Sequence, residues 1–345
     1  MDQIMNQTNF HELAVQIKGE IDKAKTILLC CHPSADPDSV GSVLSLMYYL
    51  ESVGKKVVAI RGDDELSKAN LTLPGAERIL NKNFTEIDFN SCDLLIATDV
   101  SAWQQVTKLV AFDEKNKSKI IVIDHHETNE DWGFVNCVIK DSPATAQIIY
   151  DLFAVWGVNL SSEIAKCLFA GIYADTGGFK YPMTTAHTFE IAQNLIKIAP
   201  DFAGVIFGLE NSYEPENIKF VGLALSLIET YFSGSVAISP VSLSKMQAVG
   251  IKPVLHTAKM EISNILKSVV GWNISAVLVE KEGCQTGVSL RTRDADKWDV
   301  SKIAKALGGG GHKAAAGATI NQPLAEAKEQ FLLAVESLFP DLGSR

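Results

Sequence analysis

Three adjacent residues whose side chains can hold a metal ion or move a proton, Asp124, His125 and His126, directly follow the apolar run 120–123. The β-branched residues of this run are typical of a buried parallel strand. Open α/β sheets place their active sites at the carboxyl ends of such strands. Taken singly, the triplet could equally be structural or solvated, so its meaning depends on the other acids and histidines of the chain.

A second group of metal-type side chains stands on a strand-to-helix loop. The apolar run 26–30 is strand-like, and apolar residues recur at helical spacing after residue 39. His32, Asp36 and Asp38 lie between these segments. The structural alternative is an N-cap formed by Asp38 or Ser39, but one cap does not require three such side chains. Two aspartates at i and i+2 in an extended loop can instead point toward two ions.

Two further aspartates stand at the ends of predicted elements. Asp99 follows the strand-like run 93–98, where a lone Asp would usually start a turn. Asp175 follows the helix-like run 168–174 and precedes Thr-Gly-Gly, which by itself indicates a helix C-terminus with glycine at the cap. An acid at a helix C-terminus opposes the helix dipole, and this favours a ligand role for Asp175.

Together, these residues would crowd four carboxylates and two imidazoles into one place. Neighbouring carboxylates raise one another's pKa unless a cation neutralises them, and two divalent ions would do so. Such donors suit Mn²⁺ best, with Mg²⁺ or Co²⁺ as alternatives, and zinc is less favoured because the set contains no cysteine. Two ions ~3.5–4 Å apart form the clamp used in phosphoryl chemistry, with a bridging hydroxide as nucleophile. The predicted ligands are His32, Asp36, Asp38, Asp99, His125 and Asp175.

A run of four glycines, 308–311, precedes His312 near the C-terminus. Glycines are costly to order, and they serve where backbone N–H groups approach an anion closely; a flexible turn is the alternative. Arg291 ends a strand-like run, and its planar guanidinium suits a terminal phosphate. His312 could donate a hydrogen bond or stack under a base. The predicted substrate-binding residues are Arg291, Gly309, Gly310, Gly311 and His312.

The charge balance limits the partners of the protein. The net charge is −10 and the pI is about 5.2, which argues against binding along duplex nucleic acid and favours a short anionic substrate at a local metal centre. No apolar run approaches the ~20 residues of a membrane span, and no signal peptide is visible. The cysteines lack CxxC pairing, which favours reduced thiols in the cytoplasm. We expect a cytoplasmic protein without a membrane partner. A homodimer is one assembly that the sequence allows.

The chain is long enough for two domains with separate cores. Strands and helices alternate to about residue 195, which predicts an α/β class and a doubly wound parallel sheet. A long helix is predicted over 214–231, and a smaller α+β domain follows. We expect a catalytic metal-binding domain over 1–197, a helical linker over 198–233 and a substrate-binding domain over 234–345, with the active site in the cleft between the domains.

The order and spacing of these motifs resemble a known family. His32-x-x-x-Asp36-x-Asp38, Asp99, Asp124-His125-His126 and Asp175 resemble the four motifs of the DHH phosphoesterase superfamily, and Ser289-Leu290-Arg291-Thr292 with 308–312 resemble its DHH-associated substrate domain. The chain looks most like the two-domain short-oligoribonucleotide nucleases that also dephosphorylate pAp, and like related dinucleotide phosphodiesterases. The resemblance implies that the C-terminal face grips the substrate opposite the metals.

We therefore expect a metal-dependent hydrolase that acts on phosphoric ester bonds of short oligoribonucleotides, dinucleotides or pAp. In this hypothesis Asp99 bridges the ions, His126 contacts the scissile phosphate or protonates the leaving oxygen, and Asp124 orients the histidines. The alternatives are a linear or cyclic dinucleotide phosphodiesterase, a non-catalytic nucleotide-binding sensor, an inorganic pyrophosphatase and a long-chain exonuclease. The glycine run argues against the pyrophosphatase, and the acidic balance argues against the long-chain exonuclease.

Overall fold

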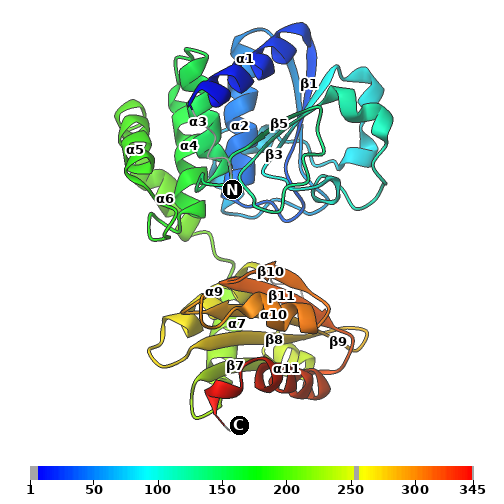
Figure 1. The fold of residues 1–345 in the computed structure, drawn as a ribbon, viewed down its shortest axis with the longest axis vertical. Coiled ribbons are helices and arrows are strands. Elements are labelled where there is room, and N and C mark those ends of the chain that lie inside the picture. Colours follow the sequence, from blue (N-terminus) through cyan, green and yellow to red (C-terminus); the bar gives the residue numbers. More distant parts are fainter. Residues whose placement is uncertain (1–6, 252–255, 344–345) are drawn as a thin grey trace. The chain divides into compact units, whose positions relative to one another are not determined.

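The computed structural model describes residues 7–251 and 256–343 (Figure 1). The chain forms two compact units, Met1–Ser212 and Tyr213–Arg345. The division between them falls inside the stretch 198–233 that the sequence assigned to a linker. Each unit contains its own sheet and its own buried core.

A five-stranded, all-parallel sheet with the strand order β2-β1-β3-β4-β5 forms the centre of the first unit. Its strands are β1 (Thr26–Cys30), β2 (Lys56–Ile60), β3 (Leu94–Thr98), β4 (Ile120–Asp124) and β5 (Val135–Val138). Because β1, β3 and β4 are adjacent and parallel, the loops that follow them leave the same edge of the sheet. This confirms the predicted α/β class and explains how motifs far apart in the sequence come together.

One face of this sheet is covered by α-helices (Figure 1). Buried side chains such as Leu44, Phe153 and Leu168 pack against strand residues such as Ile96. The helices of the unit are α1 (Gln7–Lys23), α2 (Pro37–Ser52), α3 (Thr145–Val155), α4 (Ser162–Asp175), α5 (Ala186–Ile198) and α6 (Phe202–Glu210).

The opposite face of the sheet is covered by loops and short 3₁₀ helices. Rings of Phe84, Trp103 and Trp132 pack there against Leu95 and Val122. Three of the 3₁₀ helices, Phe84–Glu86, Phe89–Ser91 and Trp103–Gln105, lie in this layer. The segments that form this aromatic layer contain no extended periodic pattern of apolar residues, so the layer was not predicted from the sequence.

The second unit contains a mixed sheet with the order β10-β11-β9-β8-β7-β6. Only β7 and β8 pair in parallel among these described strands. The strands are β6 (Glu229–Tyr231), β7 (Val236–Val241), β8 (Ile274–Lys281), β9 (Gln285–Thr292), β10 (Gly310–His312) and β11 (Ala315–Ile320). The arrangement matches the α+β pattern expected for the C-terminal part.

Helices lie on both faces of the second sheet. Phe220, Met246 and Leu266 belong to one buried cluster, and Ile303 and Phe331 belong to the other. The helices of the first face are α7 (Pro215–Ser226), α8 (Leu243–Ala248) and α9 (His256–Ser268), and those of the second are α10 (Val300–Ala306) and α11 (Leu324–Leu338). No helix in the described ranges is long and apolar enough to cross a membrane.

The helix predicted over 214–231 is wrong at its C-terminal end. The helix α7 ends at Ser226, and Glu229–Tyr231 forms the edge strand β6. These residues pair with β7 in antiparallel register, from Glu229 opposite Ile238 to Tyr231 opposite Val236. The backbone hydrogen bonds offered by β7 outweigh the helical spacing of the apolar residues, which is a weak local signal.

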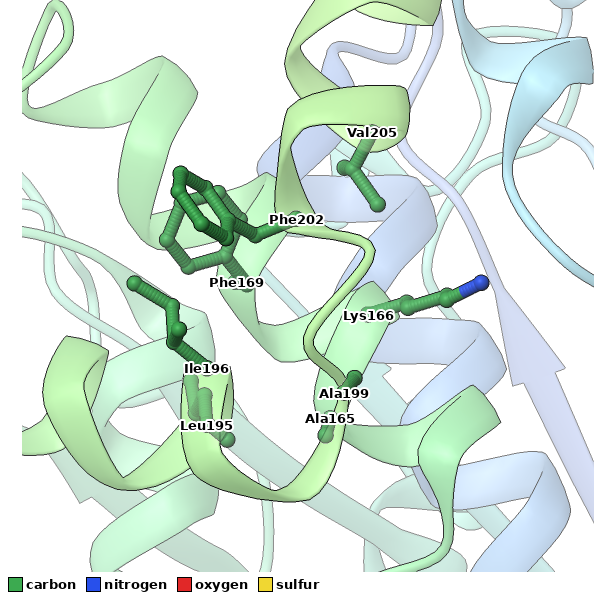
Figure 2. A pocket seen from close by; sticks show the side chains of 8 residues that line it. All are labelled: Ala165, Lys166, Phe169, Leu195, Ile196, Ala199, Phe202 and Val205. Carbon is green, nitrogen blue, oxygen red and sulfur yellow. The ribbon is translucent and has the colours of Figure 1, made fainter.

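An apolar hollow lies where α4 meets α5 and α6 (Figure 2). The Phe169 and Phe202 rings contact each other there, and Lys166 directs its amine to Asp201 at 3.3 Å. Because the lining is apolar apart from Lys166, we assign this hollow to helix packing rather than to chemistry. The lining residues are Ala165, Lys166, Phe169, Leu195, Ile196, Ala199, Phe202 and Val205.

Candidate metal centre

The loop after β1 positions His32 and Asp36. The Asp36 carboxylate caps α2 by accepting from the backbone N–H groups of Asp38 and Ser39, both at 3.0 Å. The cap is therefore Asp36, where the sequence alternative named Asp38 or Ser39. His32 donates from Nδ1 to the Pro33 carbonyl at 2.6 Å, which leaves Nε2 facing Asp36 Oδ1 at 3.7 Å.

Asp99 lies between two sets of side chains. It follows β3 with φ of 61°, a left-handed conformation that Asp tolerates better than most residues. Its Oδ2 lies 3.4 Å from His32 Nε2, and its Oδ1 lies 3.5 Å from His125 Nε2. Thr145 Oγ1 donates to Oδ1 at 3.1 Å. The two oxygens of this buried carboxylate thus face different histidines.

The second set contains Asp38, His125 and Asp175. His125 Nε2 lies 3.1 Å from Asp175 Oδ2, while its Nδ1 donates to the Ser142 carbonyl at 3.2 Å. The fully buried Asp38 accepts from the backbone N–H groups of Thr145 and Ala146, at 2.7 and 2.9 Å. Each carboxylate oxygen has a second lone pair, so Asp38 can still bind a cation.

Among the residues that the structure describes, the potential ligand atoms form three overlapping groups, and the atoms of each group lie within 4.8 Å of one another. One group is His32, Asp36 and Asp99, and a second is Asp38, His125 and Asp175. The third group adds His126 to Asp99 and His125. The structure therefore brings together all six side chains that the sequence singled out as ligands.

His126 is held from one side by Asp124. Its Nδ1 lies 2.7 Å from Asp124 Oδ1 and 3.8 Å from Asp99 Oδ1. Asp124 is fully buried, and its other oxygen accepts from Asn129 Nδ2 at 2.6 Å. Asp124 therefore contacts His126 without belonging to any of these three groups, and its contact occupies Nδ1 and not Nε2 of that ring.

Burial and crowding shift the protonation of this cluster strongly. Burial lowers the pKa of His32, but hydrogen bonds to Asp36 and Asp99 outweigh it and raise the pKa to about 11. His125 follows the same pattern, with burial opposed chiefly by Asp175, and its pKa rises to about 10. Burial and neighbouring aspartates raise the pKa of Asp175 to about 6. Without cations the cluster retains protons, so its donors fit divalent ions that would replace them.

Several supporting residues were not singled out as site residues from the sequence. Thr145 fixes Asp99 and Asp38, Ser142 fixes His125, and Asn129 fixes Asp124. Two of these contacts use backbone atoms, which any residue type supplies. Asn129, five residues after Asp124, carried no periodic or spacing signal that could have identified it.

The predicted substrate residues lie in the second unit. In the sheet register Arg291 on β9 is opposite Ala315 on β11, and Ala315 is opposite His312 on β10. The side chains of paired residues share a face of the sheet, so Arg291 and His312 share one face. Residues 310–312 form a strand and not a flexible turn.

The glycine run allows close approach of β10 to β11. A Cβ at Gly309 would collide with the Gly317 carbonyl, and a Cβ at Gly311 would lie 2.6 Å from Ala316 Cα. Gly311 also has φ of 135°, where L side chains are strained. These glycines are therefore required by the pairing of the two strands.

The parallel sheet with acids and histidines at its strand ends, followed by a mixed-sheet domain, defines a two-domain α/β protein with a candidate metal centre. Residues 26–172 match the DHH family, N-terminal domain, and residues 245–341 match the DHHA1 domain. The chain therefore contains a DHH-family N-terminal domain followed by a DHHA1 domain.

Curated relatives align over most of the chain. The bifunctional oligoribonuclease and PAP phosphatase NrnA of Thermus thermophilus is 28% identical over 319 residues, covering 90% of this chain and 89% of the relative. The protein of that name from Bacillus subtilis is 25% identical, covering 86% and 89%. A solved exopolyphosphatase-related protein from Bacteroides fragilis, 22% identical, matches with a TM-score of 0.87 over 99% of both chains, and so has the same fold.

Proposed function

We propose that this protein is a metal-dependent phosphoesterase that hydrolyses short oligoribonucleotides and dephosphorylates pAp. The observation that carries the proposal is the position of Asp99, whose two oxygens face His32 and His125 at 3.4 and 3.5 Å. Full-length relatives named oligoribonuclease and PAP phosphatase support the same substrate class.

Two divalent ions fit the donor groups. His32 and Asp36 would hold one ion, Asp38, His125 and Asp175 would hold the other, and Asp99 would serve both. Mixed imidazole and carboxylate donors favour Mn²⁺. Such ions would supply positive charge for the phosphate and an activated water as nucleophile.

The remaining polar residues of the site would transfer a proton and hold the proton-transferring side chain in position. His126 would contact the scissile phosphate or protonate the leaving oxygen through Nε2, because its Nδ1 is engaged by Asp124. Positioned proton donors contribute about 10²–10⁴-fold to rates. Asp124 would hold the ring in this tautomer, as outer partners of site histidines commonly do.

The second unit would bind the rest of the substrate. Arg291 would pair with a distal phosphate through its planar guanidinium. His312 shares its sheet face and would contact phosphate or base. Backbone N–H groups of Gly309, Gly310 and Gly311 would approach the ligand closely.

Product analysis on an equimolar panel with Mn²⁺ tests the proposal. The panel contains pAp, pApA, cyclic di-AMP, RNAs of two to five and of about twenty nucleotides, and pyrophosphate. Fastest release of mononucleotides from the short RNAs, or of AMP from pAp, supports the proposal. Preference for cyclic di-AMP or pyrophosphate would replace it with those activities, and nucleotide binding without turnover would indicate a sensor.

A further inference from the structure

Three backbone N–H groups of the loop that follows Asp175 donate to a single residue. Thr176, the C-cap of α4, accepts at its carbonyl from the N–H groups of Lys180 and Tyr181, at 2.9 and 3.0 Å. Its Oγ1 accepts from the N–H of Phe179 at 2.9 Å. The loop 176–181 therefore closes back onto the residue next to a proposed metal ligand.

The backbone of this loop is strained. Gly177, Gly178 and Phe179 all adopt positive φ, at 58°, 69° and 64°. Glycine accepts this conformation, but Phe179 pays a steric cost. The Phe179 ring is held by contacts with Phe169, Tyr173 and Phe189, with centroids 6.2, 5.9 and 5.2 Å away. The packing thus enforces a conformation that the chain would not otherwise choose.

The consequence of this conformation is the position of the Tyr181 ring. A Cβ built on Gly177 would lie 2.5, 2.6 and 2.9 Å from three carbons of that ring. Similar distances to three ring atoms mean that a face of the ring lies on the glycine. Gly177 is two residues from Asp175, so their Cα atoms are at most about 7.6 Å apart. Tyr181 is 44% exposed, so a ligand can reach this residue.

We propose that Tyr181 is a stacking platform for a nucleobase of the substrate whose phosphate occupies the metal centre. The inference rests on the proposed function and adds a base-binding residue to it. Every base has a π-face, so stacking on tyrosine holds nucleotides without selecting sequence. An oligonucleotide hydrolase that accepts any short sequence needs a contact of this kind.

The test compares substrates with and without bases. The enzyme is assayed with Mn²⁺ on pApA and on its analogues with an abasic ribose at either position. The variants are Tyr181→Leu, Tyr181→Phe and the control Phe134→Leu, which removes an exposed aromatic ring outside this loop, 54% exposed. Tyr181→Leu should raise KM for pApA about tenfold, within the range for losing one stacked base, with kcat little changed.

On the abasic analogue that lacks the stacked base, Tyr181→Leu should behave like the wild type. Tyr181→Phe and Phe134→Leu should keep the wild-type KM for pApA. Equal losses on pApA and on both abasic analogues, or no loss on pApA, would overturn the inference while leaving the phosphoesterase intact. A wild-type protein that hydrolyses none of these substrates would instead overturn the proposed function, and this inference with it.

Discussion

The three histidines of the candidate metal centre are all oriented in the same way. Each Nδ1 is engaged, by the Pro33 carbonyl for His32, by the Ser142 carbonyl for His125 and by the Asp124 carboxylate for His126. The arrangement leaves every Nε2 directed away from its partner and open to a cation or a phosphate. Residue types and spacing predicted the histidines, but they could not predict carbonyl partners set by the tertiary fold.

Asn129 should affect kcat indirectly, because it positions Asp124, which in turn holds His126. Its Nδ2 donates to Asp124 Oδ2 at 2.6 Å and to the Val100 carbonyl at 3.1 Å. Asn129→Ala should lower kcat about 10–100-fold, the usual cost of losing such a partner, with KM and bound metal unchanged. Steady-state kinetics and metal analysis check this. The control Asn194→Ala, which removes a contact to Tyr150, should remain fully active, and a parallel loss of metal in Asn129→Ala would contradict the positioning role.

Arg291 should affect substrate binding more than turnover. Loss of a charge-assisted hydrogen bond costs about 1.5–3 kcal/mol, so Arg291→Ala should raise KM for 5′-phosphorylated dinucleotides about 10–100-fold and change kcat little. Arg78→Ala, which removes a partly exposed ion pair with Glu51, is the matched control. An Arg291→Ala enzyme with unchanged KM and reduced kcat would place this residue elsewhere in the reaction.

At the scale of elements, α4 packs closely against α2, with Gly171 beside Asp38. Periodicity located the strands β1, β3 and β4 and a helix over residues 39–50, because buried parallel strands and amphipathic helices carry strong patterns. The structure begins this helix at Pro37, so Asp38 lies in its first turn and not in the preceding loop. The approach of Gly171 to Asp38 depends on how two helices cross, and no single-segment pattern encodes it. The layer of 3₁₀ helices over the other face of the first sheet was not predicted either, because it too depends on tertiary packing and not on the pattern of one segment.

Gly171→Ala should disturb both packing and ligand geometry. The added Cβ would lie 2.6 Å from Asp38 Oδ1 and 2.7 Å from Ala146 Cβ, and overpacking of this kind costs about 1–3 kcal/mol. We expect lower thermal stability and weaker Mn²⁺ binding, measured by calorimetry. The control Gly19→Ala in α1 meets nothing within 4 Å and should stabilise by about 0.5–1 kcal/mol. Unchanged Mn²⁺ affinity in Gly171→Ala would contradict the close packing around Asp38.

At the scale of the whole molecule, the proposed site residues divide between the two units. The proposed metal ligands belong to Met1–Ser212, while Arg291 and His312 belong to Tyr213–Arg345. The sequence predicted two domains from the change from alternating strands and helices to a mixed pattern. The two units divide within the predicted linker 198–233, where α6 and α7 each pack into the core of a different unit.

Metal removal should therefore destabilise the first unit and leave the stability of the second unit unchanged. A ligand that binds the folded state stabilises it by about 2.7 kcal/mol at 100 times its Kd. Chelation should increase hydrogen exchange around β1, β3, β4 and the C-terminus of α4, and should leave the sheet of the second unit unchanged. Equal increases in both units, measured peptide by peptide, would contradict assignment of the ions to the first unit.

The most direct test combines metal stoichiometry and turnover in the wild type and in Asp99→Ala. The wild type should bind two Mn²⁺ per chain and release mononucleotides from pApA. Asp99→Ala removes the carboxylate that faces both His32 and His125, so it should lose metal and show no hydrolysis. A fully active Asp99→Ala protein with two bound Mn²⁺ would contradict the proposed mechanism.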